Sequence, residues 1–328
     1  MYYQGKNVLV AGGGGLIGQS LIKQLLEQGA HVRATQYQSR SIIIEHDHLE
    51  VIQCNLKEEE EAIPVFKDMD IVFMTAAKVG GAKPIHEDPS SLIMYNLDLH
   101  AKLISYAARM KADKCCFVSS SYVYPDTREA NVESEGFEGN PWIPLNYGLG
   151  WIKRYLETLC KHFHMTSGTN YAIVRPTAIY GPYDRWDIAT SHVVPAMIVK
   201  AVNKMEPFEV WGNGEDIRCF TYVDDLAEGM LATVEHYAVA EGLNICPAEH
   251  HTVKDIIRIL FDYLDFHPDV VFNSDKPSAI PFKVSDPSRA LELINWRAKT
   301  SLEEGLQRTV DWFLEYRKLH PEAGKMDE

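Results

Sequence analysis

Ala11-Gly12-Gly13-Gly14-Gly15-Leu16-Ile17-Gly18 is the stretch that decides the fold of this 328-residue chain. It follows a β-type run over residues 7–11 and precedes apolar residues at helical spacing. A dinucleotide-binding loop needs this context, because its glycines permit a tight turn, a close approach to a pyrophosphate and close helix–strand packing. The helix N-terminus adds free N–H groups and the positive end of its dipole. A purely structural turn is the alternative. We predict that the nucleotide contacts are Gly12, Gly15, Leu16, Ile17 and Gly18.

The rest of the N-terminal half alternates β-type and helical stretches. Strands are expected over residues 31–35, 71–75, 114–119 and 171–175, and long helices over 97–110 and 148–163. This alternation is typical of βαβ units with a parallel sheet and right-handed crossovers. It predicts an α/β fold with a Rossmann-type doubly wound parallel sheet over residues 1–176, joined by part of 220–250.

Beyond residue 176 the pattern changes to short pieces separated by Pro and Gly. We predict a smaller C-terminal α/β substrate domain, mainly residues 177–328, which is interleaved with the first domain. Its helices are expected over 253–266 and 302–319. The charged run 58–61 reads as a solvated helix start.

Composition limits the possible functions. The chain is 46% hydrophobic and 24% charged, as in ordinary globular proteins. A net charge of −14 without a Lys/Arg stripe argues against nucleic acids and anionic membranes as partners. No apolar run approaches the ~18 residues that span a bilayer, and the polar N-terminus is not a secretory signal. Six cysteines without metal-like spacing read as buried reduced thiols. We therefore expect a cytoplasmic protein without a metal site.

Residues near the second and third strands bear on the choice of cofactor. NAD-binding loops usually carry an acid at the end of the second strand, where this chain has Gln36. Arg33 and Arg40 lie close by in sequence, and a guanidinium suits a 2′-phosphate. This favours NADP, with NAD still possible. Asn55 and Leu56 are expected near the adenine.

Several motifs follow the predicted strands: Thr-Ala-Ala-Lys-Val-Gly-Gly at 75–81, Ser-Ser-Ser-Tyr-Val-Tyr-Pro at 119–125, Asn-Tyr-Gly-Leu-Gly at 146–150, Ser-His-Val-Val-Pro at 191–195 and Trp-Gly-Asn-Gly at 211–214. Strand C-termini are where doubly wound folds bind ligands. Together the motifs resemble the nucleotide-sugar branch of the extended short-chain dehydrogenase/reductases over nearly the whole chain, most closely the GDP-L-fucose synthase family. The resemblance implies reduction of a GDP-bound 4-keto-6-deoxy sugar by NADPH after epimerisation at C3 and C5. It also implies a homodimer formed through the two long helices.

The resemblance further implies roles for single residues. Ser120 corresponds to a hydroxyl that holds the substrate oxygen, and Tyr147 to the acid that protonates it. Tyr122 and His192 occupy the two positions that act in epimerisation, and His192 can titrate near neutral pH. Further cofactor contacts are Ala76, Ala77, Lys78, Tyr147 and Pro176. The expected substrate contacts are Ser121, Trp211, Arg218 and Lys283.

The chain also departs from the family pattern. The lysine expected four residues after the tyrosine is Trp151, which has no charge to lower a phenol pKa. Lys153 is about 240° round the helix from Tyr147, so we expect it to point elsewhere. Arg154 returns to nearly the same face about 10 Å along the axis and is a possible substitute, as is Lys78.

The other departures bear on the type of reaction. Tyr122 stands where the family has a cysteine that acts in epimerisation. Related dehydratases carry Asp-Glu where this chain has Ser121 and Tyr122, which argues against a dehydratase. The alternatives that stay open are a nucleotide-sugar 4-epimerase with tightly bound NAD, and a catalytically impaired protein that binds NADP(H) or a sugar nucleotide.

Overall fold

The computed structural model describes residues 1–38, 41–80, 88–142, 147–276 and 280–325. Its centre is a seven-stranded sheet in which every pairing is parallel, with the order β3-β2-β1-β4-β5-β6-β11. This order is that of the doubly wound dinucleotide-binding fold, so the predicted fold class is confirmed. The strands are β1 (Asn7–Ala11), β2 (His31–Gln36), β3 (Leu49–Gln53), β4 (Ile71–Met74), β5 (Lys114–Val118), β6 (Asn170–Pro176) and β11 (Gly242–Ile245).

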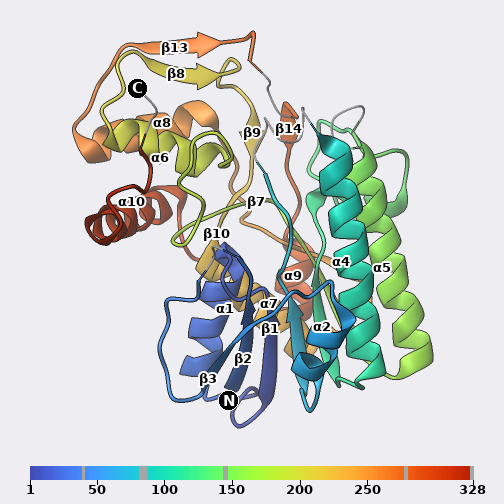
Figure 1. Ribbon diagram of the computed structural model, residues 1–328. Coiled ribbons are helices and arrows are strands. Elements are labelled where there is room, and N and C mark those ends of the chain that lie inside the picture. The colour runs from blue at the N-terminus through green and yellow to red at the C-terminus, as the bar shows by residue number, and fades with distance from the viewer. Residues whose placement is uncertain (39–40, 81–87, 143–146, 277–279, 326–328) are drawn as a thin grey trace.

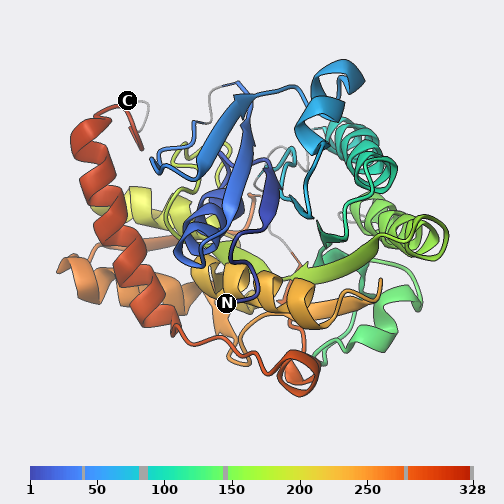
Figure 2. The same ribbon diagram turned by 90° about the horizontal axis from the view of Figure 1, so that it is seen from below.

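Helices cover both faces of this sheet, as Figure 2 shows from below. One face packs against α1 (Leu16–Glu27), α7 (Val223–His236) and α9 (Ser288–Ile294). The other packs against α2 (Glu59–Phe66), α4 (Pro89–Arg109) and α5 (Tyr147–Ser167). The central strands, such as β4 and β6, are apolar and buried on both sides, because helices cover both faces of the sheet there, whereas the edge strand β3 is largely exposed.

A second region lies beyond the carboxyl ends of the strands, at the top of Figure 1. Its core is formed by α6 (Val193–Val202), α8 (Val253–Leu264), α10 (Leu302–Leu319), β8 (Phe208–Trp211) and β10 (Phe220–Tyr222). Short pairings complete it: β7 (Ala178–Tyr180) with β10, β13 (Val270–Asn273) with β8, and β9 (Ile217–Arg218) with both β12 (His251–Thr252) and β14 (Phe282–Lys283).

The chain runs between the two regions more than once. After β10 it enters α7 and then β11, which is the edge strand of the large sheet. The domain boundary that we place near residue 176 remains a prediction. All six cysteines are buried and free. Among the helices of the described residues, none combines the length and the apolar character that crossing a bilayer requires.

Candidate active site

The glycine loop between β1 and α1 has a backbone that only glycine fits. Gly12 has a φ of +104°, and a Cβ there would lie 2.4 Å from the amide nitrogen of Ala76. A Cβ on Gly18 would lie 2.4 Å from the carbonyl oxygen of Gly12. Gly15 is the N-cap of α1, and no side chain caps this helix N-terminus or places a carboxylate in its first turn, which contains Leu16 and Ile17. The helix N-terminus can therefore receive the pyrophosphate of a dinucleotide.

The loop after β4 is fixed against the glycine loop by polar contacts. The Ala76 amide donates to the carbonyl of Ala11 at 2.7 Å. From α4, Asn96 holds the backbone of Lys78 on both sides, accepting from its amide at 2.9 Å and donating to its carbonyl at 2.8 Å. His100, also on α4, places Nε2 at 2.9 Å from the Ala76 carbonyl. Ala77 and the side chain of Lys78 stay exposed beside this anchored backbone.

The end of β2 carries no carboxylate. The Gln36 side-chain oxygen accepts from the amide of Ile42 at 2.9 Å, and the Ile42 side chain lies beside Gly13 of the glycine loop. The expectation for Arg33 is not supported, because its guanidinium turns away and pairs with Glu50 at 2.7 Å. Its other bonds, to the carbonyls of residues 65 and 67, keep it at α2. Arg40 lies outside the described residues.

Three further predicted cofactor residues also lie at strand ends. Asn55 follows β3, where its side-chain oxygen accepts from the amide of Lys57 at 3.2 Å. Leu56 is buried in the core between the sheet and α2, so its side chain packs there. Pro176 ends β6 and is buried. Asn55 and Pro176 thus sit on the ligand-binding edge of the sheet, whereas Leu56 can offer only its backbone.

The serine segment after β5 is anchored to α5. The Ser119 hydroxyl donates to Glu157 at 2.5 Å. Ser120 caps the 3-10 turn η1 (Ser121–Val123), accepting from the amide of Tyr122 at 3.2 Å. Ser121 is buried, and within the described residues its hydroxyl has no hydrogen-bond partner. An unsatisfied buried hydroxyl of this kind is available to a ligand.

Three predicted site residues come together beside this turn. The Lys283 ammonium lies 3.6 Å from the centre of the Tyr122 ring, a cation–π contact. Lys283 and Arg218 are partners in the β14–β9 register. Burial and the neighbouring Arg218 lower the pKa of Lys283 to about 7. Burial raises the pKa of Tyr122, although Arg218 opposes this, so the phenol keeps its proton at neutral pH. This cluster offers two desolvated cations to an anion.

The first turns of α5 correct the assignment of Tyr147. Tyr147, Trp151 and Tyr155 are all exposed, Tyr147 by 43%, and the first two rings contact each other edge-on at 6.2 Å. The prediction for Lys153 was wrong: its ammonium donates to the Val118 carbonyl at the carboxyl end of β5, at 2.8 Å. The rotation of 240° around the helix between Tyr147 and Lys153 was predicted correctly, but Lys153, not Tyr147, is the residue that faces the site. The residue four positions before Lys153, where the family pattern has its tyrosine, is Leu149.

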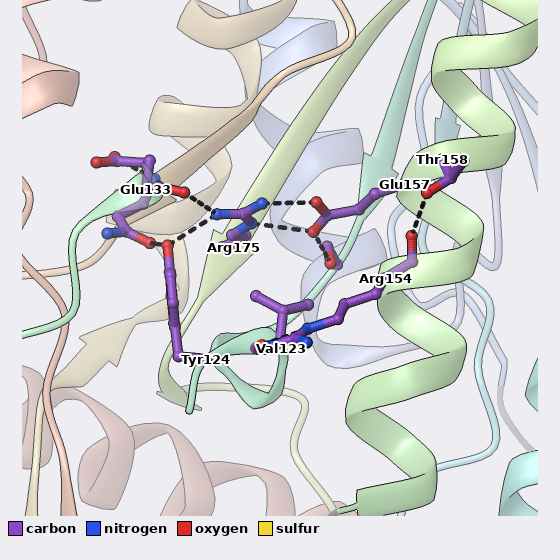
Figure 3. Close-up of polar contacts among 9 residues, drawn as sticks. Val123, Tyr124, Glu133, Arg154, Glu157, Thr158 and Arg175 are labelled. Atoms are coloured by element: carbon purple, nitrogen blue, oxygen red, sulfur yellow. Dashed lines mark hydrogen bonds and ion pairs between the residues drawn. The ribbon is translucent and has the colours of Figure 1, made fainter. Parts of the chain in front are cut away.

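Arg154 does not substitute for the missing cation. Its guanidinium donates to the backbone carbonyls of Val123, Glu138 and Gly139 at 2.7–2.8 Å. It is one of the largest fully buried side chains and joins α5 to the segment after β5. Figure 3 shows Arg154 pointing toward Val123. Its role in this fold is therefore structural.

A buried ion pair lies beside Arg154 (Figure 3). Arg175 on β6 donates to both oxygens of Glu157 on α5, at 2.7 and 3.0 Å, and both side chains are 3% exposed. Arg175 also donates to the Tyr124 hydroxyl and to the carbonyl of Glu133. Glu157 is thus shared between Arg175 and Ser119, which joins β5, β6 and α5 next to the serine segment.

The other predicted residues lie in the second region. His192 is exposed as the N-cap of α6. Trp211 ends β8, where the Lys276 ammonium lies 5.7 Å from its ring centre. The roles of His192 and Trp211 remain predictions.

Sequence reasoning missed three groups of this site: the amine of Lys153, the imidazole of His100 and the Glu157–Arg175 pair. Two signals were present. A charged residue such as Arg175 inside an apolar strand requires a buried partner. The apolar positions of α5, including Leu156 and Cys160, define a buried face to which Lys153 belongs and Tyr147 does not.

Comparison with known proteins supports the likeness over nearly the whole chain. Residues 8–246 match the model of the NAD dependent epimerase/dehydratase family. A GDP-L-fucose synthase from Sinorhizobium fredii (strain NBRC 101917 / NGR234) is 30% identical over 314 residues, covering 94% of this chain and 96% of that protein.

Solved structures agree. Epimerase Mth375 from Methanothermobacter thermautotrophicus has a TM-score of 0.88 at 25% identity, covering 98% of this chain and 96% of that chain. A GDP-L-fucose synthetase from Naegleria fowleri, solved bound to NADP, has a TM-score of 0.81 at 23% identity, with coverages of 98% and 96%. The resemblance inferred from the motifs is confirmed.

Proposed function

Because the chain belongs to the NAD dependent epimerase/dehydratase family, we propose that it is an NADP-dependent oxidoreductase/epimerase that acts on nucleotide sugars. The proposed substrate is a 4-keto-6-deoxy sugar carried by a nucleoside diphosphate, with GDP as the leading base. Support for this substrate class comes from the similar GDP-L-fucose synthase. NADP is favoured over NAD because the end of β2 holds Gln36, which does not repel a 2′-phosphate.

The observation that carries the proposal is the cation pair of Arg218 and Lys283. These residues lie side by side on β9 and β14 in a chain whose net charge is −14. Desolvation lowers the pKa of both groups, and Arg218 meets Asp216 only at 3.4 Å. Burying two cations together is costly unless an anion binds between them. A diphosphate supplies two charges of the needed sign, and Arg can bind it through two hydrogen bonds.

The residues around this pair would divide the remaining work. NADPH would supply the hydride, with its pyrophosphate at the N-terminus of α1. Ser120 and Ser121 would hold the sugar oxygens, and Trp211 would contact the nucleotide. Tyr122, whose pKa is raised by burial, would donate a proton during epimerisation rather than remove one. His192 would serve as the base in epimerisation.

A ligand screen tests the proposal. We expect GDP-sugars to raise the melting temperature more than UDP-, dTDP- or CDP-sugars, and NADP(H) to add to the shift. The Arg218→Gln variant should lose the sugar-nucleotide shift and keep the NADP(H) shift. Addition of the 4-keto-6-deoxy GDP-sugar should then consume NADPH. Cofactor that survives purification as NAD, without net NADPH consumption, would instead favour a 4-epimerase.

A second candidate is a catalytically impaired protein that binds the same ligands. It is favoured by the exposure of Tyr147 and by Leu149 on the buried face of α5, because no tyrosine there accompanies Lys153. This candidate predicts the same melting shifts with no turnover of any nucleotide sugar. Turnover by the unmodified protein excludes it.

We also propose a homodimer formed through α4 and α5. These helices lie side by side at one edge of the molecule (Figure 1). Their outer faces carry the exposed apolar side chains Met94, Tyr147, Trp151 and Tyr155. Large exposed apolar groups mark interaction surfaces. Light scattering should give the mass of a dimer, and a Tyr155→Glu substitution should give that of a monomer.

A further inference from the structure

The Lys153 side chain lies where the carboxyl end of β5 meets α5. Its ammonium donates to the Val118 carbonyl at 2.8 Å and lies 4.8 Å from the centre of the Phe117 ring. The backbone then continues through Ser119 to Ser120, two residues beyond Val118. Lys153 is partly exposed as a residue. A cation at this place is close to the serine segment that the proposed substrate would contact.

Among the described residues, the groups packed around Lys153 do not form an ion pair with it. From α4 comes the imidazole of His100, which is buried and bonded to the Ala76 carbonyl, with Nδ1 unpartnered in the described part of the chain. From α5 come Glu157, which already bonds to Arg175 and Ser119, and the buried thiol of Cys160. Within the described residues no carboxylate forms an ion pair with Lys153, so the amine can lose its proton without breaking one.

These surroundings lower the pKa of both the Lys153 amine and the His100 imidazole. Burial lowers the pKa of Lys153 to about 8, although Glu157 opposes this. Burial and the charge of Lys153 hold the pKa of His100 well below its usual range, so His100 stays neutral. An acid whose pKa is close to the working pH can both give up a proton and regain it in each turnover. An ordinary lysine, near 10.4, regains its proton easily but donates it poorly.

Helix geometry excludes the α5 tyrosines from this role. Leu149 lies about 40° from Lys153 around α5, on the same buried face, whereas Tyr147 lies about 120° away. The exposed rings of Tyr147, Trp151 and Tyr155 confirm which face meets solvent. The side chain one turn before Lys153 is therefore aliphatic and carries no proton to give.

We propose that the Lys153 ammonium is itself the proton donor to the substrate carbonyl oxygen during reduction. This inference rests on the proposed reductase function. Bound NADPH would supply a hydride to the carbonyl carbon, and the oxygen, which receives the C=O π electrons, would take a proton from Lys153 Nζ. The products are the alcohol, NADP⁺ and the neutral amine of Lys153, which regains a proton from water. Ser120 would hold the same oxygen through its hydroxyl.

Two variants and the pH profile of the unmodified enzyme test this inference. Lys153→Met should lower kcat by about 10²–10⁴-fold, as loss of a general acid does. In the unmodified enzyme kcat should fall as pH rises above about 8, because the amine must be protonated to donate. Leu149→Tyr places a phenol, whose ordinary pKa is near 10, on the same face one turn earlier. In the Lys153→Met background, where no ammonium lowers this pKa, it should restore at least about tenfold of the lost rate and move the fall in kcat to higher pH.

A second readout needs no substrate. NMR titration of ¹³C-lysine in the cofactor-free protein, with Lys153 assigned by its loss in Lys153→Arg, should show one lysine that titrates near pH 8. A pKa above 10, or a Lys153→Met enzyme with unchanged kcat and pH profile, would overturn the inference and leave the reductase function standing. Absence of turnover by the unmodified protein would overturn both.

Discussion

The glycine loop and the first turns of α5 face the same edge of the sheet, yet the sequence specifies them in different ways. At Gly12 the backbone itself is the functional group, and its φ of +104° excludes other residues. At α5 the functional groups are side chains, and a rotation of about 120° decides whether Tyr147 or Lys153 faces the site. A site built from the backbone can therefore be predicted from residue types alone. A site built from side chains can be predicted only when the buried face of the helix is also known.

The orientation of α5 depends on the buried Glu157–Arg175 pair, which holds this helix against the sheet. Glu157→Gln should lower the free energy of unfolding by about 3–5 kcal/mol, because Arg175 is then left buried without a counter-charge. Urea denaturation measures the loss. The double variant Glu157→Leu/Arg175→Met removes both charges and should recover most of it. An equal loss in both proteins would show that packing, not charge, holds α5.

A substitution at Gly12 tests whether the glycine loop binds the cofactor. In Gly12→Val the dissociation constant for NADP(H) should rise about 100-fold, because backbone strain adds to a clash with Ala76. Titration calorimetry gives the constant. The matched control is Gly168→Ala, since Gly168 also has a positive φ, +83°, but nothing lies within 4 Å of its added Cβ. Unchanged binding by Gly12→Val would mean that the loop is only a structural turn.

The pH dependence of GDP binding tests whether Lys283 contacts the diphosphate. A bound diphosphate favours the charged form of Lys283, whose pKa without ligand is about 7. GDP affinity should therefore fall as pH rises above 7, by at most about tenfold per pH unit, with uptake of protons on binding. Calorimetry in two buffers of different ionisation enthalpy measures this uptake. Lys283→Arg, which stays charged, should bind GDP without uptake; uptake that persists there would assign the proton to another group.

The smallest expected effect concerns position 151. Trp151→Lys should leave kcat per protomer within about twofold, because position 151 lies on the outer face of α5, about 160° around the helix from Lys153. Steady-state rates, with light scattering as a check on the oligomeric state, measure it. A clear rise in kcat would return Tyr147 to the active site and reverse the assignment of the two α5 faces.

Much of the fold follows directly from the sequence pattern. Strands such as β1 and β4 are short, apolar and bounded by turns, so their period and neighbours fix a parallel sheet. Arg218, Lys283 and Tyr122 were each expected at the site, but their contact depends on β9 and β14 pairing across about 65 residues of chain. The partners of Arg33 and Lys153 depend on side-chain direction, which residue spacing alone does not supply.

The carboxylate of Glu157 has a consequence for how this scaffold can diversify. By serving Ser119 and Arg175 together, it keeps helix and sheet at a constant separation without help from the reactive side chains. The reactive group can then be exchanged while its platform stays still. Other proton-donating side chains can therefore be introduced at position 149 or 153 while α5 keeps its position against the sheet.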